Sequence, residues 1–579
     1  QNTRRIPVIF GNPPYNANQR SENDNNKNEP APIADARIKE TYLAESSAQK
    51  TKLYDPYLRF FRWASDRIGD AGIIGLVTNR SYLDARHADG FRKVVAQEFQ
   101  EIWIIDLQSD VRRNPKISGT KHNVFGIQTG VAISLFVRNP QREGCEIRHI
   151  ALDDFMTAME KRRWLATHPL RQLARDGALT RLRPTLHGGW IDQPTADWSA
   201  FLPVADKAVK AGQAEAAIFR LFASSIKTNR DEWVYDVDKR QLRRKVQYFI
   251  AAFNRQIASG TMNPDTLDYS IKWSSTLKTR NKLPAYSARK LLTSLWRPFV
   301  KRHYYAEKAL SDRLTALHYQ IYGMDLKQAN LGIGISGGSA MKPFQALAFN
   351  GLADYECVEK NQLLPLWIYA TDGSRQDNIT DWALTQFRTH YTDSTIEKPD
   401  IFHYVYAVLH HPVYREIYAL NLKAEMPRIP FYPDFCPWAA WGQALMDLHT
   451  GFENVEPWPL VRRDDRAVPI PSKPRLKADK TAGVIEIDSI TRLEGVPAQA
   501  WDYRLGNRSA LEWILEEYQE ATPRDPTLRA QFNDYRFADY KESVIDLLCR
   551  VTRVSAETMS IIRCMDRASQ DHADSDSAS

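Results

Sequence analysis

The N-terminal part of the chain alternates short apolar runs with stretches in which apolar side chains recur at helical spacing. The runs are rich in β-branched and aromatic residues, a pattern typical of buried strands, and they occupy residues 6–10, 72–78, 102–107 and 130–137. Helical periodicity occupies residues 53–68 and 90–99. This alternation predicts a doubly wound parallel sheet with right-handed crossovers, closed by an antiparallel hairpin that ends in residues 130–137.

From about residue 200 onward the hydrophobic pattern becomes longer and less regular. It predicts short strands within 485–505, a helix that begins at Pro412, and further helices over 246–257, 400–410, 509–520, 538–550 and 556–565. The fold class expected is therefore α/β, with a partial Rossmann-like sheet followed by a mixed α+β domain. We place the domains at residues 1–200, 201–475 and 476–566, followed by a tail, 567–579, that we expect to be disordered.

The first predicted strand ends abruptly in the motif Gly11-Asn12-Pro13-Pro14-Tyr15. Neither proline has a backbone N–H and each fixes φ, so the strand cannot continue. Open α/β sheets bind ligands at this carboxyl edge. The side-chain oxygen of Asn12 and the carbonyl of Pro13 can accept both N–H bonds of an exocyclic amine on a flat heterocycle, and Tyr15 can stack on the ring. Such an arrangement polarises the amine nitrogen towards an electrophilic methyl group. The alternative is a rigid Pro-Pro turn with a capping Asn.

Composition and charge narrow the class of protein. The chain has 579 residues, 43% of them hydrophobic, and no apolar run approaches the roughly 20 residues that span a bilayer. The five cysteines are scattered without a C-x-x-C pair, which favours a reducing, cytoplasmic setting and argues against disulfides and a zinc site. The net charge of +8 suits a polyanionic partner. Because the sequence begins with Gln1, we expect it to be a piece of a longer protein.

The most basic stretch is the window from Ile271 to Tyr305, which contains nine Lys or Arg residues and no Asp or Glu. Aromatic and hydroxyl side chains are interleaved with these charges, a composition typical of surfaces that follow a phosphate backbone. An ordinary solvated face is the alternative. We expect DNA contacts from Lys272, Lys278, Arg280, Lys282, Arg297, Lys301 and Arg302. Two further basic clusters, Arg112–Lys121 and Lys239–Lys245, are secondary candidates.

Asn-Pro-Pro-Tyr after a strand resembles the catalytic motif of amino-methylating DNA methyltransferases, in the form typical of enzymes that modify adenine N6. The resemblance implies a flipped-out adenine and S-adenosylmethionine as the methyl donor. It also makes Phe125, which follows a loop and precedes a strand, the candidate for the second face of a base sandwich with Tyr15. A core role for Phe125 is the alternative.

Several further blocks resemble type ISP restriction–modification enzymes, which join nuclease, helicase-like motor, adenine methyltransferase and target-recognition domains in one polypeptide. The blocks span nearly the whole chain and comprise residues 294–299, 337–344, 400–410, 427–431 and 501–506. The resemblance implies the C-terminal half of such an enzyme: the late methyltransferase domain and the specificity domain, with motor and nuclease upstream and double-stranded DNA as partner.

The strands that hold the cofactor in this fold are expected upstream of the sequence. The pattern Gly332-x-Gly334-x-x-Gly337 does not replace them, because its glycines lie within a predicted strand and no acidic residue follows at the right spacing. Two hypotheses therefore remain open. The chain is either the catalytic end of an adenine methyltransferase or a DNA-recognition module without catalysis of its own.

Overall fold

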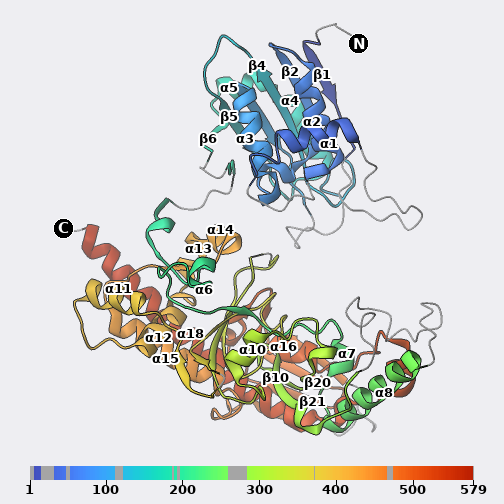
Figure 1. The fold of residues 1–579 in the computed structure, drawn as a ribbon, viewed down its shortest axis with the longest axis vertical. Coiled ribbons are helices and arrows are strands. Elements are labelled where there is room, and N and C mark those ends of the chain that lie inside the picture. The colour runs from blue at the N-terminus through green and yellow to red at the C-terminus, as the bar shows by residue number, and fades with distance from the viewer. Residues whose placement is uncertain are drawn as a thin grey trace. The chain divides into compact units, whose positions relative to one another are not determined.

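The structure is a computed structural model, and the chain in it divides into two compact units, Gln1–Gln193 and Pro194–Ser579, here called the N-terminal and C-terminal units (Figure 1). It describes residues 6–14, 31–46, 53–110, 121–184, 188–191, 196–258, 283–338, 340–370, 372–465 and 474–577. Tyr15, the Arg112–Lys116 segment and four of the basic candidates (Lys272, Lys278, Arg280 and Lys282) lie outside the described residues.

The N-terminal unit is built on a six-stranded sheet with the order β1-β2-β4-β3-β5-β6. Its strands are β1 (Val8–Gly11), β2 (Gly72–Asn79), β3 (Glu101–Asp106), β4 (Val131–Arg138), β5 (Glu146–Ala151) and β6 (Thr180–Leu182). β1 is parallel to β2, β3 is parallel to β5, and β4 is antiparallel to both β2 and β3. The predicted antiparallel strand is thus present, but it lies inside the sheet between β2 and β3 and does not close an edge.

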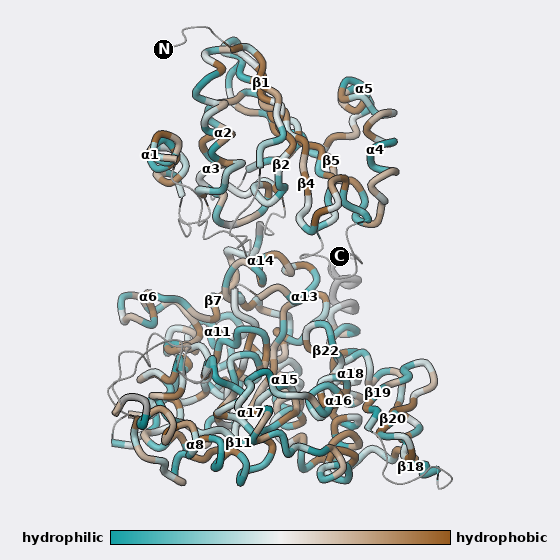
Figure 2. Tube along the Cα trace, turned by 90° about the vertical axis from the view of Figure 1, so that its right-hand side faces the viewer, coloured by the Kyte–Doolittle hydropathy of each residue, from teal (hydrophilic) through white to brown (hydrophobic). Residues whose placement is uncertain are grey.

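Helices cover both faces of this sheet. The helices α1 (Pro32–Glu40), α2 (Pro56–Arg67) and α3 (Asp89–Glu98) pack on one face, where Ile74, Ile104 and Phe136 are fully buried. The helices α4 (Ala158–Thr167) and α5 (Leu170–Arg175) pack on the other face, over Ile105 and Val131. Apolar residues, brown in Figure 2, are concentrated along β2 and β4 between these layers.

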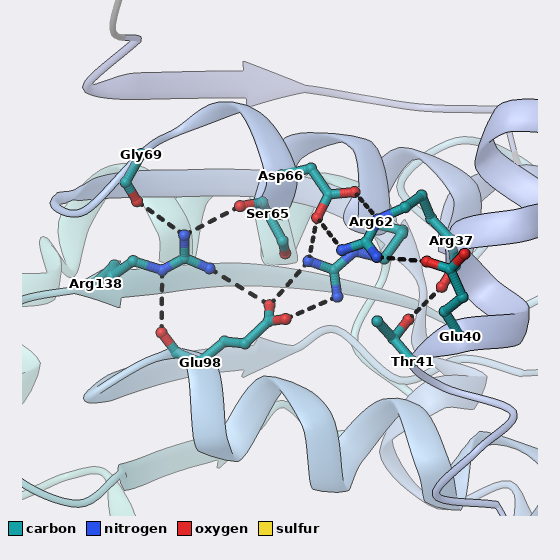
Figure 3. Close-up of polar contacts among 9 residues, drawn as sticks. All are labelled: Arg37, Glu40, Thr41, Arg62, Ser65, Asp66, Gly69, Glu98 and Arg138. Atoms are coloured by element: carbon teal, nitrogen blue, oxygen red, sulfur yellow. Dashed lines mark hydrogen bonds and ion pairs between the residues drawn. The ribbon is translucent and has the colours of Figure 1, made fainter.

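An ion-pair network fixes the helices on the α1–α3 face of the sheet (Figure 3). Arg62 of α2 is only 2% exposed, and it donates to Glu98 of α3 at 2.8 Å and to Asp66 at 2.7 Å. Arg37 of α1 donates to the same Asp66 at 3.0 Å, and Arg138 of β4 donates to the backbone carbonyl of Glu98 at 3.1 Å. The network therefore ties α1, α2 and α3 to the sheet.

β1 differs from the buried strand that its composition predicts. The side chains of Val8 and Phe10 are 45% and 72% exposed. Among the described residues β1 pairs with β2 only, so it lies at the edge of this sheet, and neither side chain belongs to the hydrophobic clusters of the unit. Its apolar composition therefore did not translate into burial.

The C-terminal unit combines three larger antiparallel sheets with helices. The sheets have the orders β10-β11-β9, β13-β12-β14-β8 and β18-β21-β20-β19. Their strands are β8 (Ala223–Ser224), β9 (Tyr235–Asp236), β10 (Leu291–Arg297), β11 (Val300–Tyr305), β12 (Leu331–Ile335), β13 (Ala346–Asn350), β14 (Gln362–Pro365), β18 (Val461–Asp464), β19 (Pro474–Asp479), β20 (Val484–Asp488) and β21 (Thr491–Glu494). Two-stranded pairs are formed by β7 (Leu202–Pro203) with β17 (Arg428–Ile429), β15 (Trp367–Tyr369) with β16 (Arg375–Asp377), and β22 (Arg504–Leu505) with β23 (Arg508–Ser509).

The helices of this unit pack against its sheets and against one another. They are α6 (Lys207–Lys210), α7 (Asp231–Val234), α8 (Lys239–Ala258), α10 (Ala316–Tyr322), α11 (Asp381–Tyr391), α12 (Lys398–Val408), α13 (Pro412–Ile417), α14 (Ala419–Ala424), α15 (Phe435–Thr450), α16 (Ala510–Glu517), α17 (Pro526–Gln531) and α18 (Lys541–Ser577). The mixed α/β architecture confirms the predicted fold class.

Two details of the C-terminal unit differ from the sequence-based division. A single helix, α18, spans Lys541–Ser577, where the sequence predicts two helices and a tail from residue 567. One hydrophobic cluster contains Trp296, Trp513 and Leu548, so residues assigned to separate domains, 201–475 and 476–566, share a core. In the part of the chain that the structure describes, no helix is long and apolar enough to cross a membrane.

The glycine pattern in β12 has a packing explanation. A Cβ at Gly332 would lie 2.5 Å from Leu363 Cδ1, and one at Gly334 would lie 2.6 Å from Asn361 Oδ1, both on the neighbouring β14 side. Glycine therefore leaves room beside β12 for the side chains of Leu363 and Asn361. These residues form a strand, as the sequence predicts, and not a phosphate-binding turn.

Candidate functional site

The candidate site lies at the carboxyl edge of the N-terminal sheet. β1, β2, β3 and β5 all run in the same direction, because β2 and β3 are both antiparallel to β4, so their carboxyl ends share this edge. Asn12, Pro13 and Pro14 follow β1 directly, with Asn12 and Pro14 exposed and Pro13 buried. Asn12 is thus accessible while the next residue, Pro13, is packed. Binding of an amine by this turn stays a prediction.

A buried ion pair supports the same edge from inside. Arg80, which follows β2, donates to both carboxylate oxygens of Asp106 at the end of β3, with distances of 2.7 to 3.0 Å. Burial would raise the pKa of Asp106, but the hydrogen bonds from Arg80 and the nearby His149, whose Nε2 lies 3.6 Å from Oδ2, hold that pKa below its usual value. A Cβ at Gly130 would lie 2.5 Å from Arg80 Cδ, so glycine is needed where β4 begins. The pair fixes the ends of β2 and β3 relative to β4.

Sequence reasoning missed this pair. The available signal was a single Asp at the end of the apolar run 102–107, which is a weak indication because acids commonly follow strands. Only the packing shows that Arg80 and Asp106 meet, since 26 residues separate them in the chain.

Phe125 lies at this edge in the loop before β4, with 47% of its surface exposed. The preceding Val124 is buried against the α4 side of the sheet. Asn123 fixes the turn between them: its Oδ1 accepts from the Phe125 N–H at 3.0 Å, and its Nδ2 donates to the Thr129 carbonyl at 2.7 Å. An exposed aromatic ring on a held turn suits stacking on a base better than a core role. The stacking role itself stays a prediction.

The described basic candidates lie on the β10–β11 hairpin, and each meets a carboxylate. Arg297 donates to Asp354 at 2.8 Å, Arg302 donates to Glu517 at 3.1 Å, and Lys301 pairs with Glu453. Burial raises the pKa of Asp354 to about 7, against the opposing effect of Arg297. Contact of these three side chains with DNA stays a prediction, and their placement favours a role in stabilising the fold.

The aromatic residues of the β10–β11 hairpin are core residues. Trp296, Tyr304 and Tyr305 are buried in the largest hydrophobic cluster, and Trp296 Nε1 donates to Glu517 at 2.6 Å. The window lacks acids in the sequence, but acids distant in the chain pair with its cations on the hairpin.

The Lys239–Lys245 cluster, the first turns of α8, contains both a buried and an exposed cation. The Lys245 ammonium is buried, donates to the carbonyls of Glu232 and Tyr235, and lies 2.7 Å from Asp236. Arg244 is exposed and pairs with Asp534 at 3.1 Å. Lys245 is thus held inside the unit, whereas the arginine next to it faces solvent.

The residues present suit the amine that accepts a methyl group, but not the cofactor that donates it. Asn12 and Pro13 offer the two acceptors that an amine needs. Within the described residues of the N-terminal unit, no glycine-rich turn follows a strand in the way that binding of a nucleoside cofactor requires. S-adenosylmethionine would therefore depend on residues outside this set. No group of three or more His, Cys, Asp or Glu side chains suited to a metal ion occurs in the described ranges.

Comparisons with known proteins agree with the division into two units. Residues 217–547 match the Type ISP C-terminal specificity domain, and residues 3–111 match the Eco57I restriction-modification methylase. No curated protein matches this sequence.

Solved structures of similar fold cover almost the whole chain. The cryo-EM structure of a DrdV–DNA complex is 45% identical with a TM-score of 0.82, covering 96% of this chain and 57% of that one. A nuclease-deletion mutant of the type ISP enzyme LlaGI, in complex with a DNA substrate mimic, is 28% identical with a TM-score of 0.77, covering 96% and 44%. The type ISP enzyme LlaBIII bound to DNA has the same fold at 24% identity and a TM-score of 0.79, covering 96% and 37%.

The chain thus spans between 37% and 57% of the length of these relatives. The specificity-domain match alone includes more than half of the residues, and it lies in the C-terminal unit, while the methylase match contains the Asn12–Pro14 turn. The chain belongs to the family of type ISP restriction–modification enzymes, of which it carries the specificity domain and the adjoining part of the methylase domain.

Proposed function

We propose that this chain provides the base-binding edge and the DNA-recognition unit of a site-specific DNA methyltransferase that modifies adenine at N6. One observation carries the proposal: the accessible Asn12 of the Asn-Pro-Pro turn lies at the same sheet edge as the exposed ring of Phe125. Both features are needed for a base that has left the duplex, because its amine and its face must be held together.

The chemistry of these residues follows from their hydrogen-bonding capacity. The Asn12 side-chain oxygen and the Pro13 carbonyl accept the two N–H bonds of the adenine amine, which leaves the nitrogen lone pair directed at an incoming methyl group. S-adenosylmethionine supplies that methyl group when bound. Tyr15 and Phe125 stack on the two faces of the ring, and this stacking offsets part of the energetic cost of extrusion.

Substitution of Asn12 by Ala in the full-length protein tests the proposal. The loss of one acceptor that acts in the transition state should raise the barrier to methylation by about 2–4 kcal/mol, which slows the reaction roughly 30- to 1,000-fold, with little change in DNA binding. Transfer of labelled methyl groups to cognate duplex measures the rate, and a binding titration of the same variant serves as control. A near-normal rate would remove the motif from the chemistry.

A second candidate function is a DNA-recognition module that has no independent catalysis. It is favoured by the absence of a cofactor-binding turn among the described residues. The full-length protein should then bind duplex DNA but not S-adenosylmethionine. Calorimetric titration of the full-length protein with each ligand separates the two functions, because an active methyltransferase binds both.

The partners and setting of the whole protein follow from the same proposal. Double-stranded DNA is the substrate, and a helicase-like motor and a nuclease are expected upstream in the full-length protein. The five cysteines are unpaired, which suits the reducing cytoplasm.

A further inference from the structure

The helix α4 contacts two chain segments at the candidate edge. A capping box fixes its start: Thr157 Oγ1 accepts from the Glu160 N–H, and the Glu160 carboxylate accepts from the Thr157 N–H at 2.7 Å. The next two residues reach in different directions. Lys161 Nζ donates to the Leu107 carbonyl at 2.6 Å and contacts Ser109 Oγ, and Arg162 Nη2 donates to the Val124 carbonyl at 2.6 Å.

The first segment is the turn after β3, which has an unfavourable backbone. Gln108 and Ser109 have φ values of 55° and 61°, in the left-handed region that residues with a Cβ rarely adopt. Such conformations persist where the surroundings determine them, and they concentrate at functional sites. Here Lys161, whose side chain is fully buried, contacts the turn from α4, and the Asp154 carboxylate accepts from the Ser109 N–H at 2.8 Å.

The second segment is the loop that carries Phe125. The Ala158 N–H donates to the Lys121 carbonyl at 3.1 Å, and His122 Nδ1 lies 3.3 Å from the Met156 carbonyl, so the start of the loop is attached to the start of α4. Arg162 binds the carbonyl of Val124, the residue directly before Phe125. The hydrogen bond from α4 therefore holds the loop at the peptide group directly before Phe125.

We propose that Arg162 is a positioning residue that holds the Phe125 ring in place to receive the extruded base, while Lys161 fixes the neighbouring β3 turn. The inference rests on the function proposed above for Phe125. A ring that is already ordered loses little conformational freedom when a base stacks on it, whereas a loose loop must be ordered at each encounter. Arg162 is exposed and does not belong to the hydrophobic cluster under α4, so its contact acts on the loop rather than on the fold.

The full-length protein with Arg162→Met tests this role, and Arg163→Met is the matched control. Arg163 is the next residue on α4, is exposed and carries the same charge. Arg162→Met should lower kcat about five- to tenfold, reduce the fluorescence change of 2-aminopurine at the target position, and leave the melting temperature unchanged. Arg163→Met should leave all three unchanged, and Arg162→Lys, which retains a donor, should restore part of the rate.

A double-mutant cycle with Phe125→Ala decides whether Arg162 acts through the ring. If it does, Arg162→Met has no further effect on kcat or on 2-aminopurine fluorescence once Phe125 is Ala. Additive losses, or a wild-type rate for Arg162→Met alone, overturn the inference. A wild-type rate for Phe125→Ala overturns both the stacking role and this inference, but not the methyltransferase proposal, which fails only if Asn12→Ala stays active.

Lys161→Met provides a second measurement on the same helix. It removes the buried ammonium from the strained turn at nearly constant volume, so both the melting temperature and kcat should fall. A lower melting temperature with full activity would show that Lys161 stabilises the fold without positioning the edge.

Discussion

The carboxyl edge of the N-terminal sheet and the β10–β11 hairpin of the C-terminal unit make an instructive pair. Both contain aromatic and polar residues in a pattern that predicts ligand contact. At the edge, the ring of Phe125 and the amide of Asn12 are exposed. In the hairpin, the aromatic side chains are buried and the cations Arg297 and Arg302 meet carboxylates.

The difference arises because the Pro-Pro motif restricts the backbone, whereas the basic run does not restrict which side chains pack against it. Two consecutive prolines end a strand whatever the rest of the chain does, so the turn after β1 must leave the sheet. A run of cations sets no such limit, because acids from elsewhere can pair with it. Asp354, Glu453 and Glu517 do so here, from positions 57, 152 and 215 residues away. A sequence motif that restricts the backbone, such as Pro-Pro, therefore predicts the placement of its residues better than a run of cations without nearby acids does.

The largest expected effect is a loss of folding stability on substitution of Arg297 by Met in the β10–β11 hairpin. This change leaves Asp354 buried without its partner, which should destabilise the protein by about 3–5 kcal/mol. Chemical denaturation measures the loss, and Lys301→Met, an exposed pair, should cost at most about 1 kcal/mol. If both variants melt like the wild type but bind DNA more weakly, the hairpin is a DNA surface after all.

The same variant has a pH dependence with a definite sign. Burial raises the pKa of Asp354 to about 7 in the folded protein, above the value of about 3.9 that is usual for an unfolded chain. The folded state therefore binds the proton more tightly, and stability falls as pH rises from the unfolded pKa through the folded one. Without Arg297 the folded pKa should rise further and the fall in stability should extend to higher pH, so the variant should be less impaired at pH 5 than at pH 8.

A smaller effect, on DNA binding alone, is expected from substitutions in the part of the basic window that lies outside the described residues. Replacing Lys278, Arg280 and Lys282 together should reduce the slope of log K against log salt by about one unit for each phosphate that the variant no longer binds. Cognate and random duplexes should weaken alike, and the melting temperature should hardly change. A lower melting temperature with an unchanged slope would extend the hairpin's stabilising role to this part of the window.

The smallest effect concerns the exposed ring at the edge. Phe125→Ala, like Tyr15→Ala, should cost about 1–3 kcal/mol of base stacking, seen in turnover and in 2-aminopurine fluorescence. Phe60→Ala on α2 is the control, because Phe60 is exposed to a similar extent, 45% against 47%. Equal results for Phe125 and Phe60 would mean that the ring is an ordinary surface residue.

The alternation of strands and helices in the first 140 residues was predicted from the sequence because periodicity is a local property. α2, α3, β2 and β3 lie within a few residues of their predicted bounds. The order of the strands was not predictable in this way: β4 lies between β2 and β3, and β1 is an exposed edge, since pairing depends on long-range contacts. The two predicted helices that merge into α18 show the same limit, because packing decided their continuity.

The sequence by itself determined the Asn12-Pro13-Pro14 turn after a strand and its place at the carboxyl edge, since proline chemistry and the parallel sheet leave no other arrangement. It also placed a loop before β4 that carries Phe125. Only the tertiary structure decided that Phe125 is exposed, that Arg80 and Asp106 support the edge, and that Lys161 and Arg162 hold its loops. Those contacts join residues from 26 to 54 positions apart, and no local pattern specifies which distant partner a side chain meets.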